Sequence, residues 1–262
     1  MNFLPISAIF FRHLRFMLNY LNKLLFTFYW PFLDVLLWGF LGKYMQDLQG
    51  SNNNLEVILL LSILLWACFA RLGMEIFNAL IEELWTQNVI NIFASPITLF
   101  EWIAGVLSFI ILLSVILISF LLLAIKLFYS VSILYLFKNF IIFAPFLFFS
   151  GIVIGFLILS ILIYFGMRAA EIAYVIIWSF MPFSGVFYPV ESLPAWAQKI
   201  SSVLPMSYIF TGMRAYVLQN VNPIPYIIKS SILILIYGIL FLFLFFYMFN
   251  KSKNKGLNRL TD

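Results

Sequence analysis

Charged residues are scarce in this sequence. Only 10% of its 262 residues are Asp, Glu, Lys or Arg, and 65% are hydrophobic, whereas soluble domains carry about 25% charged residues. No polar stretch is long enough to form a soluble catalytic domain. The composition therefore predicts an all-α polytopic membrane protein, in which residues 1–262 form a single transmembrane domain with short loops.

Cysteine and histidine are almost absent, and this excludes several chemistries. The single Cys68 can form no intrachain disulfide, and its apolar surroundings favour an inert packed thiol. The single His13 and the scattered carboxylates give neither metal-ligand spacing nor a nucleophile set. The sequence also lacks GxxxxGK[ST], the loop that holds ATP phosphates. We therefore expect no catalytic residue, cofactor or metal in this chain, and energy for any work has to come from a partner.

Apolar runs recur along the chain and predict six transmembrane helices. A spanning helix takes about 20 apolar residues. The candidate runs are 24–42, 55–80, 99–125, 140–165, 172–186 and 224–249. Pro31 is expected to kink the first of them. Gly151 and Gly155 form GxxxG in the fourth, a spacing that permits close approach of an unspecified neighbouring helix.

The two ends of the chain are basic. Within residues 1–23 four polar residues recur on one helical face, which predicts an amphipathic helix in the cytoplasmic interface; they are Arg12, Arg15, Asn19 and Asn22. The alternative is simply the basic flank of the first span. With the basic tail at 250–262, this charge places both termini in the cytoplasm and favours lipid headgroups over nucleic acid as a partner.

Three ionisable residues, Asp34, Arg71 and Glu75, fall inside predicted spans, where charge is costly and marks a partner or a water-filled path. Arg71 and Glu75 are spaced i,i+4, and antiparallel packing of the first two spans brings Asp34 to a similar depth. We predict an intramembrane charge cluster, either a clamp between helices or a substrate contact. An alternative function rests on the same residues: an ion- or proton-coupled transporter that uses them as a relay.

The residues from Glu82 to Phe93 form the one markedly polar stretch of the first half, and Ser95-Pro96 ends it. This composition predicts a short helix at the cytoplasmic surface over 82–96. The alternative is a plain polar loop.

Residues 184–217 follow one strongly apolar run and precede the last one. A Phe-Tyr-Pro turn is followed by two segments, about 191–203 and 206–218, that are too short to span a bilayer. Physical reasoning leaves two interpretations open. One is a re-entrant helical hairpin over 187–218, between the fifth and sixth spans, which dips into the membrane and returns; the other is an amphipathic extracytoplasmic loop.

The residue pattern of this stretch resembles the permease subunits of type-2 ATP-binding-cassette (ABC) exporters. The matching positions are Ser184, Gly185, Phe187, Tyr188, Pro189, Leu193, Pro194, Trp196, Pro205 and Arg214. In that family the stretch is a re-entrant helical pair that forms a gate near the outer mouth of the transport path. The resemblance extends to an ATPase-coupling segment, here carried by Glu82, Glu83, Trp85, Ser95, Pro96 and Glu101. The family's usual Gly-Thr-x-Glu before Ser-Pro is absent, and residues 87–90 stand in its place.

The resemblance implies an exporter in the plasma (bacterial inner) membrane. Its partners would be a cytoplasmic ABC ATPase subunit, which binds ATP and Mg, a second permease copy (identical or a paralogue), and membrane lipid. The substrate would be an amphipathic, glycan or lipid-type molecule, or a drug. Aromatic side chains near the outer end would stack on sugars or line an apolar path; they are Trp178, Phe180, Phe183, Phe187, Tyr188, Trp196 and Tyr208. The alternative is that the Trp and Tyr residues form an interfacial belt and the Phe residues face lipid. A third class, a membrane scaffold or lipid-modifying enzyme, is disfavoured as an enzyme by the scarcity of nucleophiles and metal ligands.

Overall fold

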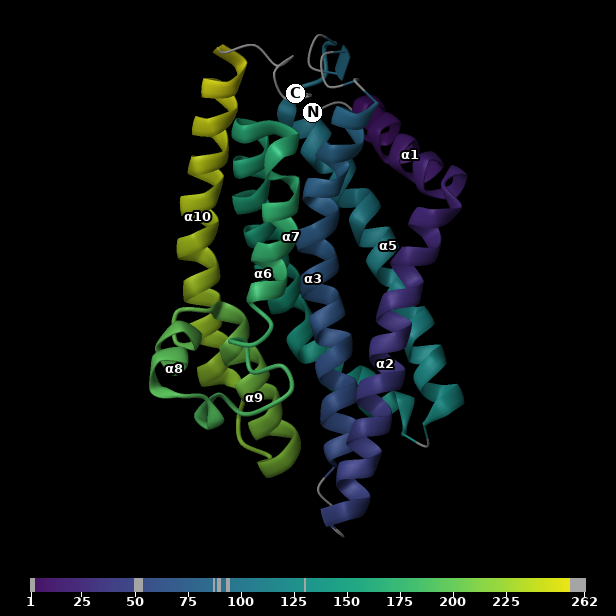
Figure 1. Ribbon diagram of the computed structural model, residues 1–262, viewed down its shortest axis with the longest axis vertical. Helices are drawn as coiled ribbons and strands as arrows, with labels where there is room; N and C mark the ends of the chain where they lie inside the picture. Colours follow the sequence, from purple (N-terminus) through teal and green to yellow (C-terminus); the bar gives the residue numbers. More distant parts are fainter. Residues whose placement is uncertain are drawn as a thin grey trace.

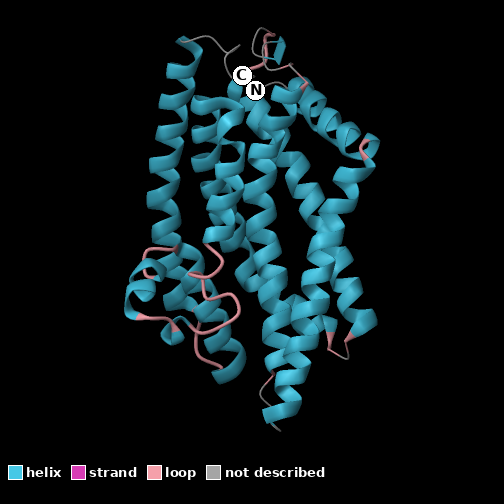
Figure 2. Ribbon diagram, in the orientation of Figure 1, coloured by secondary structure: helices cyan, strands magenta, loops and turns pink. Residues whose placement is uncertain are grey.

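The structure is a computed structural model that describes residues 3–49, 54–86, 88, 91–92, 95–129 and 131–254. This part of the chain contains helices, turns and loops, and no strand (Figure 2). The helices are α1 (Phe3–Asn19), α2 (Leu21–Gln49), α3 (Leu55–Trp85), α5 (Leu99–Phe128), α6 (Ile133–Phe165), η1 (Gly166–Ala169), α7 (Ala170–Ser179), η2 (Val190–Ser192), α8 (Ala195–Ser201), α9 (Pro205–Gln219) and α10 (Ile224–Asn254).

Five helical segments of the described chain are long and apolar enough to cross a membrane, as expected for a polytopic membrane protein. They are Leu21–Leu48, Leu55–Trp85, Leu99–Phe128, Ile133–Ser179 and Ile224–Lys253. The long helices run roughly side by side, with α3 in the middle and both labelled termini at one end of the bundle (Figure 1).

The expected fifth span is not a separate long helix. The fourth segment of 47 residues contains α6, η1 and α7 together, and α7 itself has ten residues. The helix is interrupted at Gly166, whose φ of 74° and ψ of −160° lie in a region of backbone conformation that essentially only glycine adopts. α6 therefore ends here, and α7 follows after a single 3₁₀ turn.

The core lies around α3, which is buried over nearly its whole length and packs most extensively against α6. The two glycines of the GxxxG motif in α6 allow α6 and α3 to approach closely. A Cβ atom on Gly151 would lie 2.5 Å from the Phe69 carbonyl oxygen, and one on Gly155 would lie 2.7 Å from Ile76 Cδ1. The neighbour that the sequence left unspecified is α3.

α1 packs across α5 at the end of the bundle that holds the termini (Figure 1). Its buried residues, Ile9, His13 and Met17, recur every four residues on one face. Arg15 and Asn19 are exposed, as expected for an interface helix, whereas Arg12 forms an ion pair with Glu83. α1 ends at Asn19, so Asn22, the fourth residue of the predicted polar face, belongs to α2.

α8 and α9 lie in the half of the bundle away from the termini, and α9 packs against α10 (Figure 1). Their lengths are seven and 15 residues, so both are shorter than the roughly 20 residues of a span. α9 begins at Pro205, which suits the first position of a helix because its missing N–H has no intrahelical partner there.

Candidate functional site

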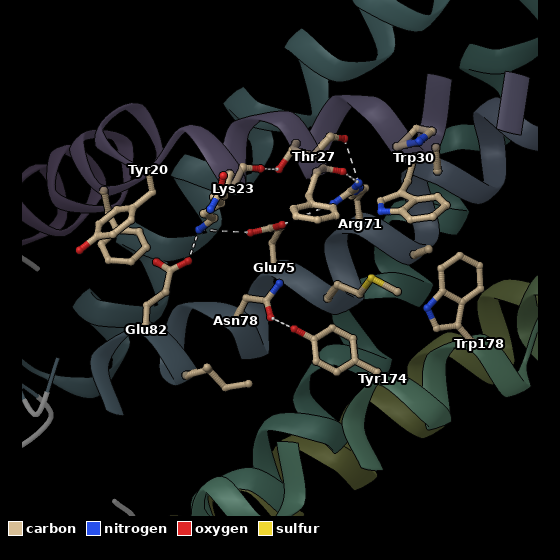
Figure 3. A pocket seen from close by; sticks show the side chains of 18 of the residues that line it. Tyr20, Lys23, Thr27, Trp30, Arg71, Glu75, Asn78, Glu82, Tyr174 and Trp178 are labelled. Atoms are coloured by element: carbon tan, nitrogen blue, oxygen red, sulfur yellow. Dashed lines mark hydrogen bonds and ion pairs between the residues drawn. The ribbon is translucent and has the colours of Figure 1, made fainter. Parts of the chain in front are cut away.

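A pocket of about 1070 Å³ lies between α2, α3 and α7, near the end of the bundle that holds α1. Its volume is at the upper end of the range of small-molecule sites. One set of lining side chains is aromatic: Phe16, Tyr20, Phe26, Trp30, Trp66, Trp85, Tyr174 and Trp178. A second set is polar: Asn22, Lys23, Thr27, Asp34, Arg71, Glu75, Asn78, Glu82 and Thr86. The pocket thus combines apolar walls with charged groups between helices that are long and apolar enough to span a membrane (Figure 3).

The polar side of the pocket on α3 is a single stripe. Arg71, Glu75, Asn78 and Glu82 follow one another at steps of four, three and four residues, so they share one helical face. Apolar residues occupy the other faces of α3 and pack into the core. The amphipathic spacing therefore turns these four side chains together toward α2 and α7.

Lys23 and Arg71 connect this stripe to α2. Lys23 forms an ion pair with Glu82 and lies 3.8 Å from a carboxylate oxygen of Glu75, which in turn is 3.8 Å from Arg71 (Figure 3). Removing one partner from a buried ion pair leaves an uncompensated charge and costs about 3–5 kcal/mol. The chain of ion pairs therefore fixes α2 on α3.

Pro31 explains a second contact of Arg71. Proline has no N–H, so it cannot bond the carbonyl four residues earlier, and the Thr27 oxygen is left without its helical donor. Arg71 Nη2 donates to this oxygen at 2.8 Å and to the Phe26 oxygen at 3.0 Å. The guanidinium thus donates to the Thr27 carbonyl oxygen that Pro31 leaves without a helical donor, inside a helix long and apolar enough to span a membrane.

The charge cluster predicted from the sequence is assembled in part. Arg71 and Glu75 form the expected i,i+4 pair. Asp34 lines the same pocket but is in no salt bridge among the described residues. Sequence reasoning missed Lys23, which takes the bridging position instead.

A second group of charges joins α1 to the end of α3. His13 Nδ1 lies 3.3 Å from Glu82, its Nε2 lies 3.9 Å from Glu83, and Arg12 forms an ion pair with Glu83. Both glutamates are buried, 6% and 2% exposed. Within the described residues no group of His, Cys, Asp and Glu is arranged to hold a metal ion. The group is therefore a junction of ion pairs and hydrogen bonds between α1, α2 and α3.

The residues expected to couple to an ATPase fall into different environments. Glu82 and Glu83 face α1 and α2 from the last turns of α3, rather than opening a separate surface helix. Trp85 is 69% exposed and Pro96 is also exposed, with Ser95 partly so. Residues 87, 89–90 and 93–94 of the predicted segment lie outside the described residues, as do residues 255–262 of the basic tail.

Glu101, the last residue of this predicted set, has a local role. Thr98 and Glu101 form a capping box at the start of α5: the Glu101 N–H donates to Thr98 Oγ1 at 3.3 Å, and the Thr98 N–H donates to the Glu101 carboxylate at 3.0 Å. Such a box satisfies N–H groups that have no partner at a helix start. The carboxylate is buried in this arrangement.

The ten residues of the predicted gate are spread over the turn that follows α7 and over η2, α8 and α9, and Arg214 on α9 holds that turn. Its Nη2 donates to the Val186 oxygen at 2.6 Å, and Gly185 beside it has a φ of 66°, which favours glycine. Burial lowers the pKa of the Arg214 guanidinium to about 10, although the charge of Glu191 opposes this shift. The hydroxyl of Tyr188 donates to the Pro182 oxygen at 2.7 Å.

The turn also contacts α2. The ring of Phe187 stacks on Trp38 with centroids 3.5 Å apart and an angle of 10° between the planes. Ser184 is fully buried and bonds the Phe180 oxygen at 2.5 Å. Trp196, by contrast, is 62% exposed on α8. Pro189, Leu193 and Pro194 lie at the ends of η2 and α8, where Pro194 precedes the first residue of α8.

The spacing of polar residues on α3 could have revealed Asn78, a pocket residue that was not predicted from the sequence. The 4–3–4 spacing of polar residues on α3 places Asn78 with Arg71 and Glu82, and Asn78 accepts a hydrogen bond from the Tyr174 hydroxyl at 3.0 Å. The contributions of Lys23 and Trp30 depend on how α2 is aligned with α3, which no local pattern specifies.

No protein-family model and no curated protein matches this chain. The resemblance to exporter permeases consequently stays a prediction that rests on the quoted residues.

Proposed function

We propose that this chain is the membrane-spanning subunit of an ABC exporter of the type-2 kind, driven by ATP hydrolysis in a separate cytoplasmic subunit. The observation that carries the proposal is the position of α2. This helix lines the pocket through Trp30 and Asp34 and also stacks on the gate turn through Trp38 and Phe187. A movement of α2 would therefore act on the pocket and the turn together, as alternating access requires.

The proposed topology has six spans and both termini in the cytoplasm of a plasma (bacterial inner) membrane. In it, α7 and the turns after it form a short fifth crossing. Residues 187–218 form a re-entrant hairpin, which is supported by the shortness of α8 and α9 and by the packing of α9 against α10 in the half of the bundle away from the termini (Figure 1). The exposed apolar faces of α2 and α10 are available for lipid or for a second permease copy.

The proposed ATPase contact is the segment 85–96. Trp85 and Pro96 are both exposed, and Trp85 is the last residue of α3, which ends at the end of the bundle that holds the termini (Figure 1). In this proposal Glu82 and Glu83 do not contact the ATPase themselves. They connect the end of α3, next to the segment, to α1 and α2 through ion pairs. A push on the segment would reach α2 through these ion pairs.

A pull-down of the tagged chain from mild detergent, analysed by mass spectrometry, tests the class. We expect a cytoplasmic ATPase with a GxxxxGK[ST] motif at equal stoichiometry. Trp85→Asp should reduce its recovery at least about tenfold, a loss of about 1.4 kcal/mol. Trp196→Asp is the matched control, because it has similar exposure (62% against 69%) at the opposite end, and it should recover the ATPase like the wild type. A preparation that contains this chain alone across several detergents would contradict the proposal.

A second candidate is the ion-coupled transporter. It is favoured by one observation, the chain of charges from Glu82 through Lys23 and Glu75 to Arg71 along the pocket. This function would operate without any ATPase, and reconstituted vesicles that contain only this chain would show substrate uptake driven by an ion gradient.

A further inference from the structure

Asp34 is the carboxylate of the pocket that has no salt-bridge partner among the described residues. It lies seven residues after Thr27 on α2, two helical turns beyond the carbonyl that Arg71 binds. Lys23 and Arg71, by contrast, already pair with Glu82 and Glu75. A carboxylate in a membrane-spanning helix is costly without a counter-charge. The charge of Arg71 acts on Asp34 from beyond salt-bridge distance and is shared with Glu75, so the position of Asp34 favours an additional cation from outside the chain.

The charge of the pocket lining agrees with this reasoning. Two cationic side chains, Lys23 and Arg71, face three carboxylates, Asp34, Glu75 and Glu82. The lining therefore has one excess negative charge when these groups are ionised. Lys23 and Arg71 both pair with glutamates of α3. Asp34 is within the electrostatic reach of Arg71 but forms no salt bridge with it among the described residues, so Asp34 is the carboxylate of the three that is least compensated.

The walls beside Asp34 are suited to the rest of such a ligand. Trp30 is one turn before Asp34 on α2, and Trp66 and Trp178 have centroids 6.4 Å apart (Figure 3 shows Trp30 and Trp178). Indole rings attract cations through their faces and bury apolar groups. Trp30 and Trp178 are also 55% and 46% exposed, so the pocket is open to its surroundings at these side chains.

From this geometry we infer that the pocket binds an amphipathic organic cation of single positive charge, with the charge at Asp34 and the apolar body among Trp30, Trp66 and Trp178. As the substrate class of an exporter, this inference rests on the proposed function. The binding itself needs no ATPase. The same chemistry is offered by a free amphipathic cation and by the amine headgroup of a lipid.

The test uses two ions of nearly equal shape and opposite charge, tetraphenylphosphonium and tetraphenylborate. Their binding to the full chain, purified in a neutral maltoside detergent, is followed by tryptophan fluorescence with empty micelles as the blank. We expect the wild type to bind the phosphonium at least about tenfold more tightly than the borate, a difference of about 1.4 kcal/mol. Asp34→Asn should remove this preference, and Asp34→Glu should retain most of it.

Asp47→Asn is the matched control, because Asp47 is an exposed carboxylate on the same helix that does not line the pocket. It should bind both ions like the wild type. The inference is overturned if Asp34→Asn binds the phosphonium as tightly as the wild type does, or if the wild type prefers the borate.

Two further measurements identify the source of the cation and distinguish failure of the cation inference from failure of the proposed exporter function. Displacement of the phosphonium by added phosphatidylethanolamine assigns the site to a lipid amine, and lack of displacement assigns it to a free cation; both support cation binding. If the phosphonium binds at Asp34 but no ATPase co-purifies, the proposed exporter fails alone. If an ATPase co-purifies but binding is independent of Asp34, the cation inference fails alone.

Discussion

The contact between Arg71 and the backbone beside Pro31 can be tested by a double-mutant cycle. Arg71→Met keeps a long side chain but removes the guanidinium that donates to the Thr27 oxygen at 2.8 Å. It also removes a charge near Glu75. The companion change, Pro31→Ala, restores an N–H at that position, which can bond the Thr27 oxygen as in an ordinary helix.

The expected magnitude follows from two terms. Loss of one partner of a buried ion pair costs about 3–5 kcal/mol, and we take the lower end because Lys23 also lies 3.8 Å from Glu75. A buried carbonyl left without a donor adds about 1–3 kcal/mol. Arg71→Met should therefore lower the free energy of unfolding by about 4 kcal/mol in the proline background. With Pro31→Ala the loss should be smaller by about 1–2 kcal/mol, because the carbonyl finds its helical donor.

Reversible unfolding in mixed maltoside and dodecyl sulfate micelles measures these free energies. Arg15→Met is the control, because Arg15 is exposed on α1 and is in no salt bridge among the described residues. It should change stability by less than about 0.5 kcal/mol. Strict additivity of Pro31→Ala and Arg71→Met would refute the reasoning, because it would mean that the guanidinium does not replace the missing N–H.

Two further predictions concern packing and topology. Gly151→Ala should destabilise the protein by about 1–3 kcal/mol, since its Cβ would lie 2.5 Å from a backbone oxygen of α3, whereas Gly238→Ala, with its nearest neighbour at 3.6 Å, should be neutral or stabilising in the same unfolding assay. In a Cys68→Ser background, cysteines placed at Ala195 and Lys199 should react with a membrane-impermeant thiol reagent from outside intact cells; labelling from the cytoplasmic side alone would contradict the proposed topology.

Periodicity and composition predicted the membrane class because they are local properties. Five of the six expected spans correspond to long helices, and the N-terminal helix was also expected. The fifth was less well predicted. Gly166 can adopt a positive φ, but glycine is common within apolar helices, so its residue type alone does not reveal where α6 ends.

The charge cluster shows where prediction from sequence stops. The i,i+4 pair of Arg71 and Glu75 follows from helix geometry, and the structure has it. The choice of Lys23 over Asp34 as the bridging residue depends on the alignment of α2 with α3. That alignment is set by Pro31, the guanidinium and the packing of the helices together, so no single pattern in the sequence contains it.

The same contacts indicate which helix is able to move under the proposed function. α3 and α6 are joined by close backbone packing at Gly151 and Gly155, which a small force does not change because packed interfaces resist deformation. In the most apolar stretch of α2, 22% of the residues are buried, against 89% in that of α3. The contacts of α2 with α3 include the ion pairs of Lys23 and the hydrogen bonds from Arg71. Ion pairs and hydrogen bonds can exchange partners in discrete steps, as switching elements do. Under the proposed function, α2 is therefore the helix that would move over the α3–α6 pair, and Lys23 and Arg71 would be the contacts that exchange partners.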